Sequence, residues 1–194
     1  MKLIDSKTYL NLAKSFAGEC QAYVRYKFVE YGARYNKLEN VAQIVDKIAY
    51  NEFNHARVLY TKIQSASKDT IANIEVCTGY PFKEKWDVTE NMLLTADDEH
   101  EEAEAYTRYA ETAREEGFEE IATLFEELAK IELQHEEVFK ALHKELANDT
   151  LYKSKEKTLW VCDGCGYRCE AKEPWEKCPV CQAERQALHI NFTL

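Results

Sequence analysis

Two short strings constrain the fold of this chain more than any other feature: Glu52-Phe-Asn-His55 and Glu132-Leu-Gln-His135. In each, a carboxylate and an imidazole stand three residues apart, so both side chains leave one face of a helix. Both pairs also occupy positions that the 3.6-residue period assigns to the buried face. A lone carboxylate there costs several kcal/mol unless something pairs with it. Two such pairs on separate helices therefore predict a shared cation.

The apolar periodicity predicts four long helices, over about residues 6–35, 38–65, 88–116 and 118–146. Gly117 follows the third helix and is suited to end it, because glycine accepts the left-handed backbone conformation. The connection between the second and third helices is long for a bundle and contains Gly79 and Pro81. That length favours a crossover that runs along the bundle rather than a hairpin.

The two halves of the helical region carry the same spacing. A lone Glu precedes the Glu of the Glu-x-x-His pair by 33 residues and precedes a Tyr by seven. The residues concerned are Glu19, Tyr26 and Glu52 in the first half, and Glu99, Tyr106 and Glu132 in the second. Two helix pairs of this kind match a ferritin-like four-helix bundle with two metal ions. Four carboxylates neutralise two divalent irons, and two imidazoles complete their coordination.

The third helix offers six acidic residues between positions 97 and 104. At about 100° per residue, Glu99 and Glu102 fall within roughly 40° of the inward Tyr106, so we predict these two as ligands. A π-bulge would re-aim the helix by about one residue. The ligands would then be Asp98 and Glu101. Tyr26 and Tyr106 either pack as core aromatics or hydrogen-bond metal-bound carboxylates, since a buried phenol needs a partner.

The last part of the chain contains two C-x-x-C knuckles separated by twelve residues, formed by Cys162, Cys165, Cys178 and Cys181. Four thiolates in this arrangement bind one tetrahedral metal ion, Fe or Zn. A segment of about 36 residues cannot build an adequate core alone, so the metal supplies folding energy. We therefore predict a helical bundle over 1–148, a linker over 149–158 and a metal-knuckle domain over 159–194.

The charge, hydropathy and cysteine content of the chain limit the kinds of partner and the location that can be expected. The formal charge of −10 argues against nucleic acid and anionic membranes, which require clustered Lys and Arg. The sequence has no run of about 18 apolar residues to span a bilayer, and Asp5 interrupts the start before a signal peptide could form. Four of the seven cysteines sit in metal-ligand spacing, which favours a reducing cytoplasm.

These motifs resemble the rubrerythrin family, a ferritin-like di-iron bundle followed by a rubredoxin-like domain, over essentially the whole chain. Further strings that carry the resemblance are Ala17-Gly18-Glu19, the segment 113–122 and Cys165-Gly-Tyr167. The resemblance implies a non-haem peroxidase that reduces hydrogen peroxide to water and protects against oxidative stress. It also implies a di-iron centre, one iron in the four-cysteine site (with Zn as a possible substitute) and an electron-donor reductase or rubredoxin.

The resemblance further implies a homodimer in which the mononuclear iron of one subunit faces the di-iron site of the other. By position, Glu52 and Glu132 would bridge the irons and Glu19 and Glu99 would be terminal ligands. His135 would hold one iron. The other iron would exchange His55 for Glu102 on oxidation, and Glu102 could shuttle protons, so the residues assigned to catalysis are Glu102, His55, Tyr26 and Tyr106.

Two departures from the family pattern are visible. Relatives carry one more residue between the second carboxylate of the third helix and the following Tyr, so a bulge there would be straightened. The second knuckle is followed by Gln182-Ala183 where free rubredoxins carry Gly, a residue that accommodates a positive φ.

Two rival functions are considered. Ferroxidation and iron storage would use the bundle alone and would predict a large hollow oligomer. A non-enzymatic zinc-ribbon adaptor would predict a colourless protein that contains zinc.

Overall fold

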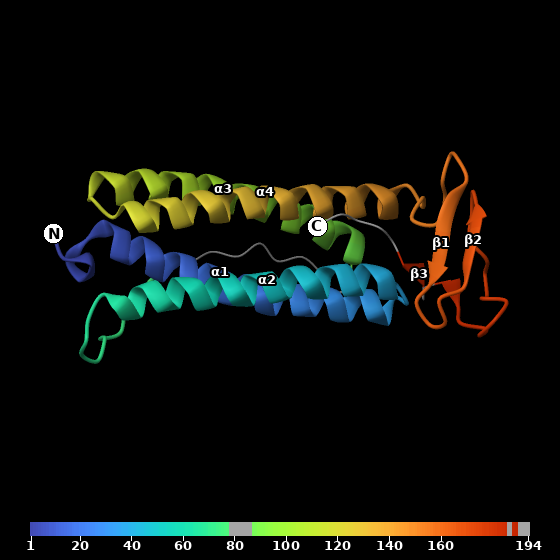
Figure 1. Cartoon of the computed structure of the whole chain (residues 1–194), viewed down its shortest axis with the longest axis horizontal. Coiled ribbons are helices and arrows are strands. Elements are labelled where there is room, and N and C mark those ends of the chain that lie inside the picture. Colours follow the sequence, from blue (N-terminus) through green and yellow to red (C-terminus); the bar gives the residue numbers. More distant parts are fainter. Residues whose placement is uncertain (78–86, 186–187, 190–194) are drawn as a thin grey trace.

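Four long helices and a small sheet form the protein, seen in a computed structural model that describes residues 1–77, 87–185 and 188–189 (Figure 1). A 3₁₀ turn at Leu3–Asp5 leads into the helices, and three short strands follow them. The helices are α1 (Lys7–Tyr35), α2 (Glu39–Ser65), α3 (Val88–Glu115) and α4 (Glu119–Ala147), and the strands are β1 (Thr158–Cys162), β2 (Arg168–Ala171) and β3 (Leu188–His189).

The helices form two antiparallel hairpins, α1 with α2 and α3 with α4, that pack into one bundle (Figure 1). Helix α2 ends near the N-terminus of the chain, whereas α3 begins on the side of the bundle nearer the strands. The end of α2 and the start of α3 therefore lie toward opposite ends of the bundle, as the predicted crossover requires. Gly79 and Pro81, which the sequence analysis placed in that connection, lie outside the described residues.

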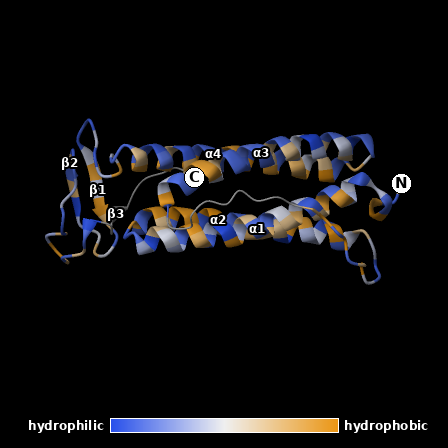
Figure 2. Ribbon diagram, turned by 180° about the vertical axis from the view of Figure 1, so that it is seen from behind, coloured by the Kyte–Doolittle hydropathy of each residue, from blue (hydrophilic) through white to orange (hydrophobic). Residues whose placement is uncertain are grey.

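The helices are amphipathic, and hydrophobic and hydrophilic positions alternate along each of them (Figure 2). Their buried faces form two separate apolar clusters. One contains Ile48 and Phe139, on the half of the bundle nearer the strands. The other contains Leu12 and Phe125, on the opposite half. Each fully buried side chain of this size contributes about 1.5–3 kcal/mol, so both halves are firmly packed. Glu52, between the clusters, belongs to a polar layer.

The strands form an antiparallel sheet in the order β2-β1-β3. Trp160 of β1 pairs with Cys169 of β2 and donates a hydrogen bond from its indole to the carbonyl of Ala171 (3.0 Å). The sheet lies at the end of the bundle where α1 meets α2 (Figure 1). There the hydroxyl of Tyr152 donates to Asn40 at the start of α2 (3.1 Å). The mainly α fold with a small knuckle domain is therefore confirmed, while the exact domain limits stay a prediction.

Among the described residues, no helix combines the length and hydropathy that crossing a membrane requires.

The two hairpins end their first helices in the same way, 80 positions apart in the sequence. Gly117 has φ +84°, and the amide of Phe118 donates to the carbonyl of Ala113 (2.8 Å). In the first hairpin the amide of Leu38 donates to Ala33 (2.8 Å), and Lys37 takes the left-handed conformation with φ +59°. This is the capping geometry that favours glycine, so the first hairpin carries backbone strain that the second does not.

Exchanging the two residues should have opposite effects on stability. Replacing Lys37 by Gly should raise the free energy of unfolding by about 0.5–1 kcal/mol, because strain relief exceeds the added entropy of the unfolded chain. Gly117→Lys should lower it by about 1 kcal/mol, although a Cβ at position 117 would meet no atom within 4 Å. Denaturant midpoints of the two variants measure the effect, and shifts in the same direction would contradict the assignment.

Candidate metal centres

Six predicted ligand residues meet in the polar layer at the middle of the bundle. Each helix contributes: α1 and α3 supply one carboxylate each, and α2 and α4 supply a carboxylate and an imidazole each. They form two overlapping groups whose ligand atoms lie within 4.8 Å of one another, one made of Glu19, Glu52, His55 and Glu132 and the other of Glu52, Glu99, Glu132 and His135. All six are buried, and the four carboxylates are at most 1% exposed.

Glu52 and Glu132 belong to both groups and lie between the two imidazoles. The Nδ1 atom of His135 is 3.0 Å from one oxygen of Glu52 and 3.0 Å from one oxygen of Glu132. The Nδ1 atom of His55 is 2.9 Å and 3.3 Å from their other oxygens. Each shared carboxylate thus turns one oxygen toward each imidazole, the arrangement required of a bridge between two ions.

The donor atoms in this layer fit a pair of cations. Among the described residues, six buried atoms of the layer lack a hydrogen-bond partner: Oε2 of Glu19, Oε1 of Glu52, both carboxylate oxygens of Glu132, and Nδ1 of His55 and of His135. The contacts between them are short but are not directed as hydrogen bonds. Each such atom would cost about 1–3 kcal/mol if nothing bound it. Carboxylate oxygens with imidazole nitrogens are the ligands that divalent iron and zinc prefer.

Two buried tyrosines hold the outer carboxylates in position. The hydroxyl of Tyr26 donates to Glu99 (2.6 Å), so it bonds a predicted ligand. The hydroxyl of Tyr106 lies within hydrogen-bonding distance of both Glu19 and Glu102, at 2.8 Å from the latter. A phenol has one hydrogen, so one of these two carboxyl groups must be protonated and donate. The tyrosines therefore act on opposite sides of the layer, as the repeat suggests.

Helix α3 is α-helical from Val88 to Glu115, so the straight register applies. Glu99 points into the layer, and Glu102 lies at its edge against Tyr106. Asp98 instead forms an ion pair with Arg25, and Glu101 is exposed, so the register of a bulged helix is not adopted. Neither Glu102 nor the Arg25–Asp98 pair belongs to the two ligand groups.

The electrostatics of the layer reflect a surplus of acid. Burial, reinforced by neighbouring carboxylates, raises the pKa of Glu19 and of Glu99 well above the ordinary value and that of Glu102 to about 8. Burial would lower the pKa of His135, but the carboxylates of Glu132 and Glu52, each 3.0 Å from its Nδ1 atom, raise it to about 9. Without metal, protons neutralise some of the carboxylates and give the imidazoles a positive charge, which reduces the repulsion within the layer.

Asn51 is a site residue that the sequence analysis missed. Its Nδ2 atom lies 3.2 Å from Nε2 of His135 and holds the ring so that Nδ1 faces the carboxylates. This contact crosses from α2 to α4, so neither the spacing within a helix nor the repeat pointed to it. His55, the equivalent imidazole, is 8% exposed whereas His135 is 2% exposed. The two imidazoles are therefore held differently.

The four knuckle cysteines meet at the strand end of the molecule. The sulfurs of Cys162 and Cys181 are 3.7 Å apart and those of Cys165 and Cys178 are 3.6 Å apart. Metal–sulfur bonds of about 2.3 Å in a tetrahedron place sulfurs about 3.8 Å apart, so the four thiols fit one metal ion. Their ligand atoms all lie within 4.8 Å of one another.

The turns after the two knuckles are alike despite their different residues. Gly166 has φ +75° and donates to the carbonyl of Cys162 (2.7 Å). Gln182 has φ +61° and donates to the carbonyl of Cys178 (2.9 Å). The positive φ expected of a glycine is thus retained by Gln182 at some cost in strain.

The bundle and the knuckle together define a class: ferritin-like four-helix proteins with two adjacent carboxylate–histidine metal positions and a separate four-cysteine site. The rubrerythrin family model matches residues 11–158, and the model of the rubrerythrin rubredoxin-like domain matches residues 160–188. The chain therefore belongs to the rubrerythrin family. It carries the residues of a di-iron carboxylate site and a rubredoxin-like four-cysteine knuckle.

Individual relatives agree with this assignment. A rubrerythrin of Clostridium perfringens is 36% identical over 182 residues, which are 92% of this chain and 91% of that protein. A rubrerythrin of Porphyromonas gingivalis is 33% identical over 191 residues, 96% of this chain and 92% of that protein. Among solved structures, nigerythrin in a mixed-valence state shares the fold, with a TM-score of 0.62 and 24% identity over 95% of this chain and 88% of that chain.

Replacing Asn51 by Ala should lower the metal affinity of the position that contains His135 about 10–100-fold, because the imidazole loses its anchor. Asn54→Ala is the matched control, since Asn54 lies one turn away, is half-buried like Asn51 and bonds the carbonyl of Tyr50. Competition with a chelator under anaerobic conditions measures both affinities. Equal affinities in the two variants would remove Asn51 from the site.

Metal loading of the bundle should release protons. The raised pKa values of His135 and His55 mean that both imidazoles are protonated near pH 7 in the metal-free protein. Their protons must leave before lone pairs can bind metal, so affinity rises with pH, by about tenfold or more per unit between pH 6 and 8. Calorimetry in buffers of different ionisation enthalpy, on protein whose four-cysteine site is already filled, measures this. A pH-independent affinity would contradict it.

Proposed function

We propose that this protein is a non-haem di-iron peroxidase that reduces hydrogen peroxide to water, with electrons delivered through the four-cysteine iron site. The observation that carries the proposal is the presence, on one chain, of a buried two-metal ligand set and a four-thiolate ligand set. The first suits a two-electron reaction, and the second suits one-electron transfer. Membership of the rubrerythrin family supports the same reading.

Reduction of one hydrogen peroxide to two waters takes two electrons and two protons, and a reduced iron pair supplies both electrons when bound. The protein residues would hold the pair and manage the protons. Glu52 and Glu132 would bridge, Glu19 and Glu99 would be outer ligands, and His135 would be fixed by Asn51. Tyr26 and Tyr106 hold the outer carboxylates by hydrogen bonds. Glu102, which lies at the edge of the layer and bonds to Tyr106, would hold and pass on a proton during the reaction.

The exchange of His55 for Glu102 at one iron is consistent with how the two are held. Glu102 lies outside both ligand groups and is bonded to Tyr106 at 2.8 Å. His55 is more exposed than His135, which Asn51 anchors. His55 is thus the less constrained imidazole, and it is the one that Glu102 would replace as a ligand. Replacement of His135 instead would break its hydrogen bond to Asn51.

We further propose a homodimer in which the four-cysteine iron of one subunit faces the di-iron site of the other. Glu52 lies 13 residues into α2, about 20 Å along the bundle from the end that faces the strands. Electron transfer within one chain would have to cover that length. Val24, Phe28, Tyr31 and Tyr35 follow one side of α1 and are 47–72% exposed. Such a stripe is the kind of surface that an interface covers.

A cytoplasmic location, protection from oxidative stress, and a reductase or rubredoxin as electron donor are part of the same proposal. The rival readings are less well supported. A zinc-ribbon adaptor would not require the buried carboxylates and imidazoles of the bundle. Iron storage would use the bundle alone and would not require the four-cysteine site. A bacterioferritin of Desulfovibrio desulfuricans has a TM-score of 0.61 at 24% identity, over 73% of this chain and 81% of that chain, which speaks to the fold alone.

Stopped-flow mixing of the iron-loaded, fully reduced protein with hydrogen peroxide under anaerobic conditions tests the proposal. One peroxide should oxidise two irons of the bundle, followed by oxidation of the four-cysteine iron. Cys178→Ser should retain the first phase and abolish sustained turnover with an external reductant. Gel filtration separates the expected dimer from the large shell of an iron store. Release of water-insoluble ferric iron instead of catalytic turnover would overturn the proposal.

In the same assay, Glu102→Ala should lower kcat for hydrogen peroxide about 100-fold while two irons stay bound, since a positioned acid contributes that order of rate. Glu104→Ala is the matched control, because Glu104 is exposed and lies two positions away on α3. Unchanged peroxide kinetics in the Glu102 variant would remove Glu102 from the mechanism.

A further inference from the structure

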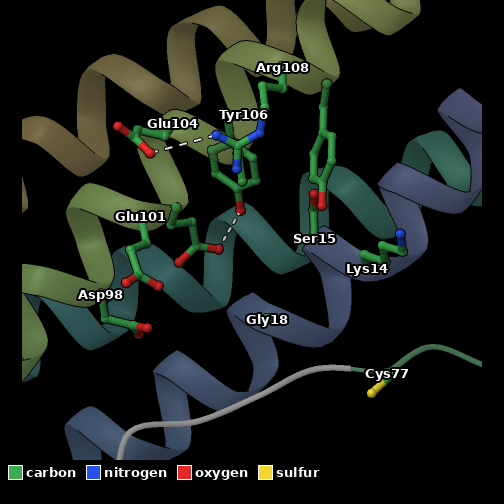
Figure 3. A pocket seen from close by; sticks show the side chains of 12 residues that line it. Lys14, Ser15, Gly18, Cys77, Asp98, Glu101, Glu104, Tyr106 and Arg108 are labelled. Atoms are coloured by element: carbon green, nitrogen blue, oxygen red, sulfur yellow. Dashed lines mark hydrogen bonds and ion pairs between the residues drawn. The ribbon is translucent and has the colours of Figure 1, made fainter.

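A hollow of about 530 Å³ opens between α1 and α3 next to the polar layer (Figure 3). Lys14, Ser15 and Gly18 line it from α1, and Glu102, Ala105 and Tyr109 are among the residues that line it from α3. Of the seven carboxylates and imidazoles assigned to the di-iron site, Glu102 alone lines this hollow. The hollow therefore reaches the site through the one carboxylate that lies at the edge of the layer.

Ser15 is the second feature that marks the hollow as a binding site. The side chain is 4% exposed, and its hydroxyl has no hydrogen-bond partner among the described residues. An unpaired buried hydroxyl is unfavourable by about 1–3 kcal/mol, so it is suited to a small polar ligand. Ser15 lies four residues before Glu19, one helical turn away on the same face of α1. A ligand bonded to Ser15 would thus lie beside the ligand layer.

Gly18 provides the space in which Glu102 faces the hollow. A Cβ atom at this position would come within 3.3 Å of a carboxylate oxygen of Glu102. Helix α1 thus approaches α3 closely here because position 18 lacks a side chain. The equivalent position in the second half, 80 residues later, is Asp98, which forms an ion pair with Arg25. The second half of the bundle thus carries a charged side chain where the first half has a glycine.

The size and lining of the hollow indicate what it can hold. A water molecule takes up about 30 Å³ in the liquid, so hydrogen peroxide would fill a small part of the space. Pockets for small organic molecules begin at about 300 Å³. Ala105 and the ring of Tyr109 offer apolar surface. The rim carries more acidic than basic residues, with Asp98, Glu101 and Glu104 beside Lys14 and Arg108, which disfavours anions.

We propose that this hollow admits uncharged organic hydroperoxides, with the hydroperoxy group between Ser15 and Glu102 and the organic substituent against Ala105 and Tyr109. This inference rests on the proposed peroxidase function and extends its substrate class. The O–O bond breaks, the oxygen attached to carbon leaves as an alcohol, and the other leaves as water. Two electrons come from the reduced iron pair, and two protons are taken up from the protein and solvent, so the reaction is balanced.

Iron-loaded full-length protein tests the proposal with hydrogen peroxide and cumene hydroperoxide in parallel. Wild type should reduce both. Ala105→Leu should lower the kcat/KM ratio of cumene hydroperoxide to hydrogen peroxide at least tenfold, since added side-chain bulk in a pocket discriminates by this order. Ala17→Leu is the matched control, because Ala17 is a half-buried helical alanine that lines a different hollow. Its ratio should equal that of wild type.

Ser15→Ala should raise KM for both peroxides about three- to tenfold, the value of one hydrogen bond, with kcat retained. Ser65→Ala is its control, because Ser65 is exposed and bonds the carbonyl of Lys62. A binding measurement independent of turnover uses the product alcohol, 2-phenyl-2-propanol. Saturation-transfer NMR on the zinc-loaded full chain should detect its contact with the protein in wild type and lose it in Ala105→Leu.

The outcomes separate this inference from the function on which it rests. If wild type reduces neither peroxide, the peroxidase proposal fails. If it reduces hydrogen peroxide but not cumene hydroperoxide, or if Ala105→Leu lowers both activities equally, the peroxidase proposal stands and the organic-hydroperoxide inference is overturned. Alcohol binding that is unchanged by Ala105→Leu would likewise overturn it.

Discussion

Four carboxylates buried side by side are the constraint on which the rest of this structure depends. Glu19, Glu52, Glu99 and Glu132 come from four different helices, and like charges this close repel strongly at low dielectric. Removing one partner of a buried ion pair destabilises a folded protein by about 3–5 kcal/mol. The apolar clusters on either side of the layer hold the helices in place, and cations between the carboxylates remove the repulsion. Metal binding and bundle packing therefore stabilise the same arrangement.

The pseudo-repeat explains both what is shared and what differs between the two metal positions. Residues 80 positions apart occupy equivalent places, including the paired glutamates, histidines and tyrosines. The differences lie at a few positions. Glu102 corresponds to Ala22, and Asn51 corresponds to Ile131. One half thus has an additional carboxylate, and one imidazole has an additional anchor. A symmetric scaffold becomes chemically asymmetric through these substitutions, so the two metal positions differ in the groups around them.

Much of the fold was predictable because it depends on local periodicity. Helix limits and the inward direction of Glu99 follow from the 3.6-residue period, and the structure agrees with both. Contacts between different helices were not predictable from one sequence. Asn51 reaches His135 from another helix, and Asp98 pairs with Arg25 instead of joining the acidic ligands. Such contacts depend on how helices are placed relative to one another, which periodicity within a single helix does not encode.

The structure also separates the hollow beside Glu102 from the four-cysteine site of the same chain. Tyr152 precedes the strands and bonds to Asn40 at the end of the bundle where α1 meets α2. Lys14 to Gly18 precede Glu19 on α1, which runs toward that end, so the hollow lies on the far side of the ligand layer. A hydroperoxide that approaches Glu102 there would meet the irons without passing the thiolate site. Because thiolates are readily oxidised by peroxides, this separation would keep the four-cysteine site of the same chain away from a peroxide in the hollow.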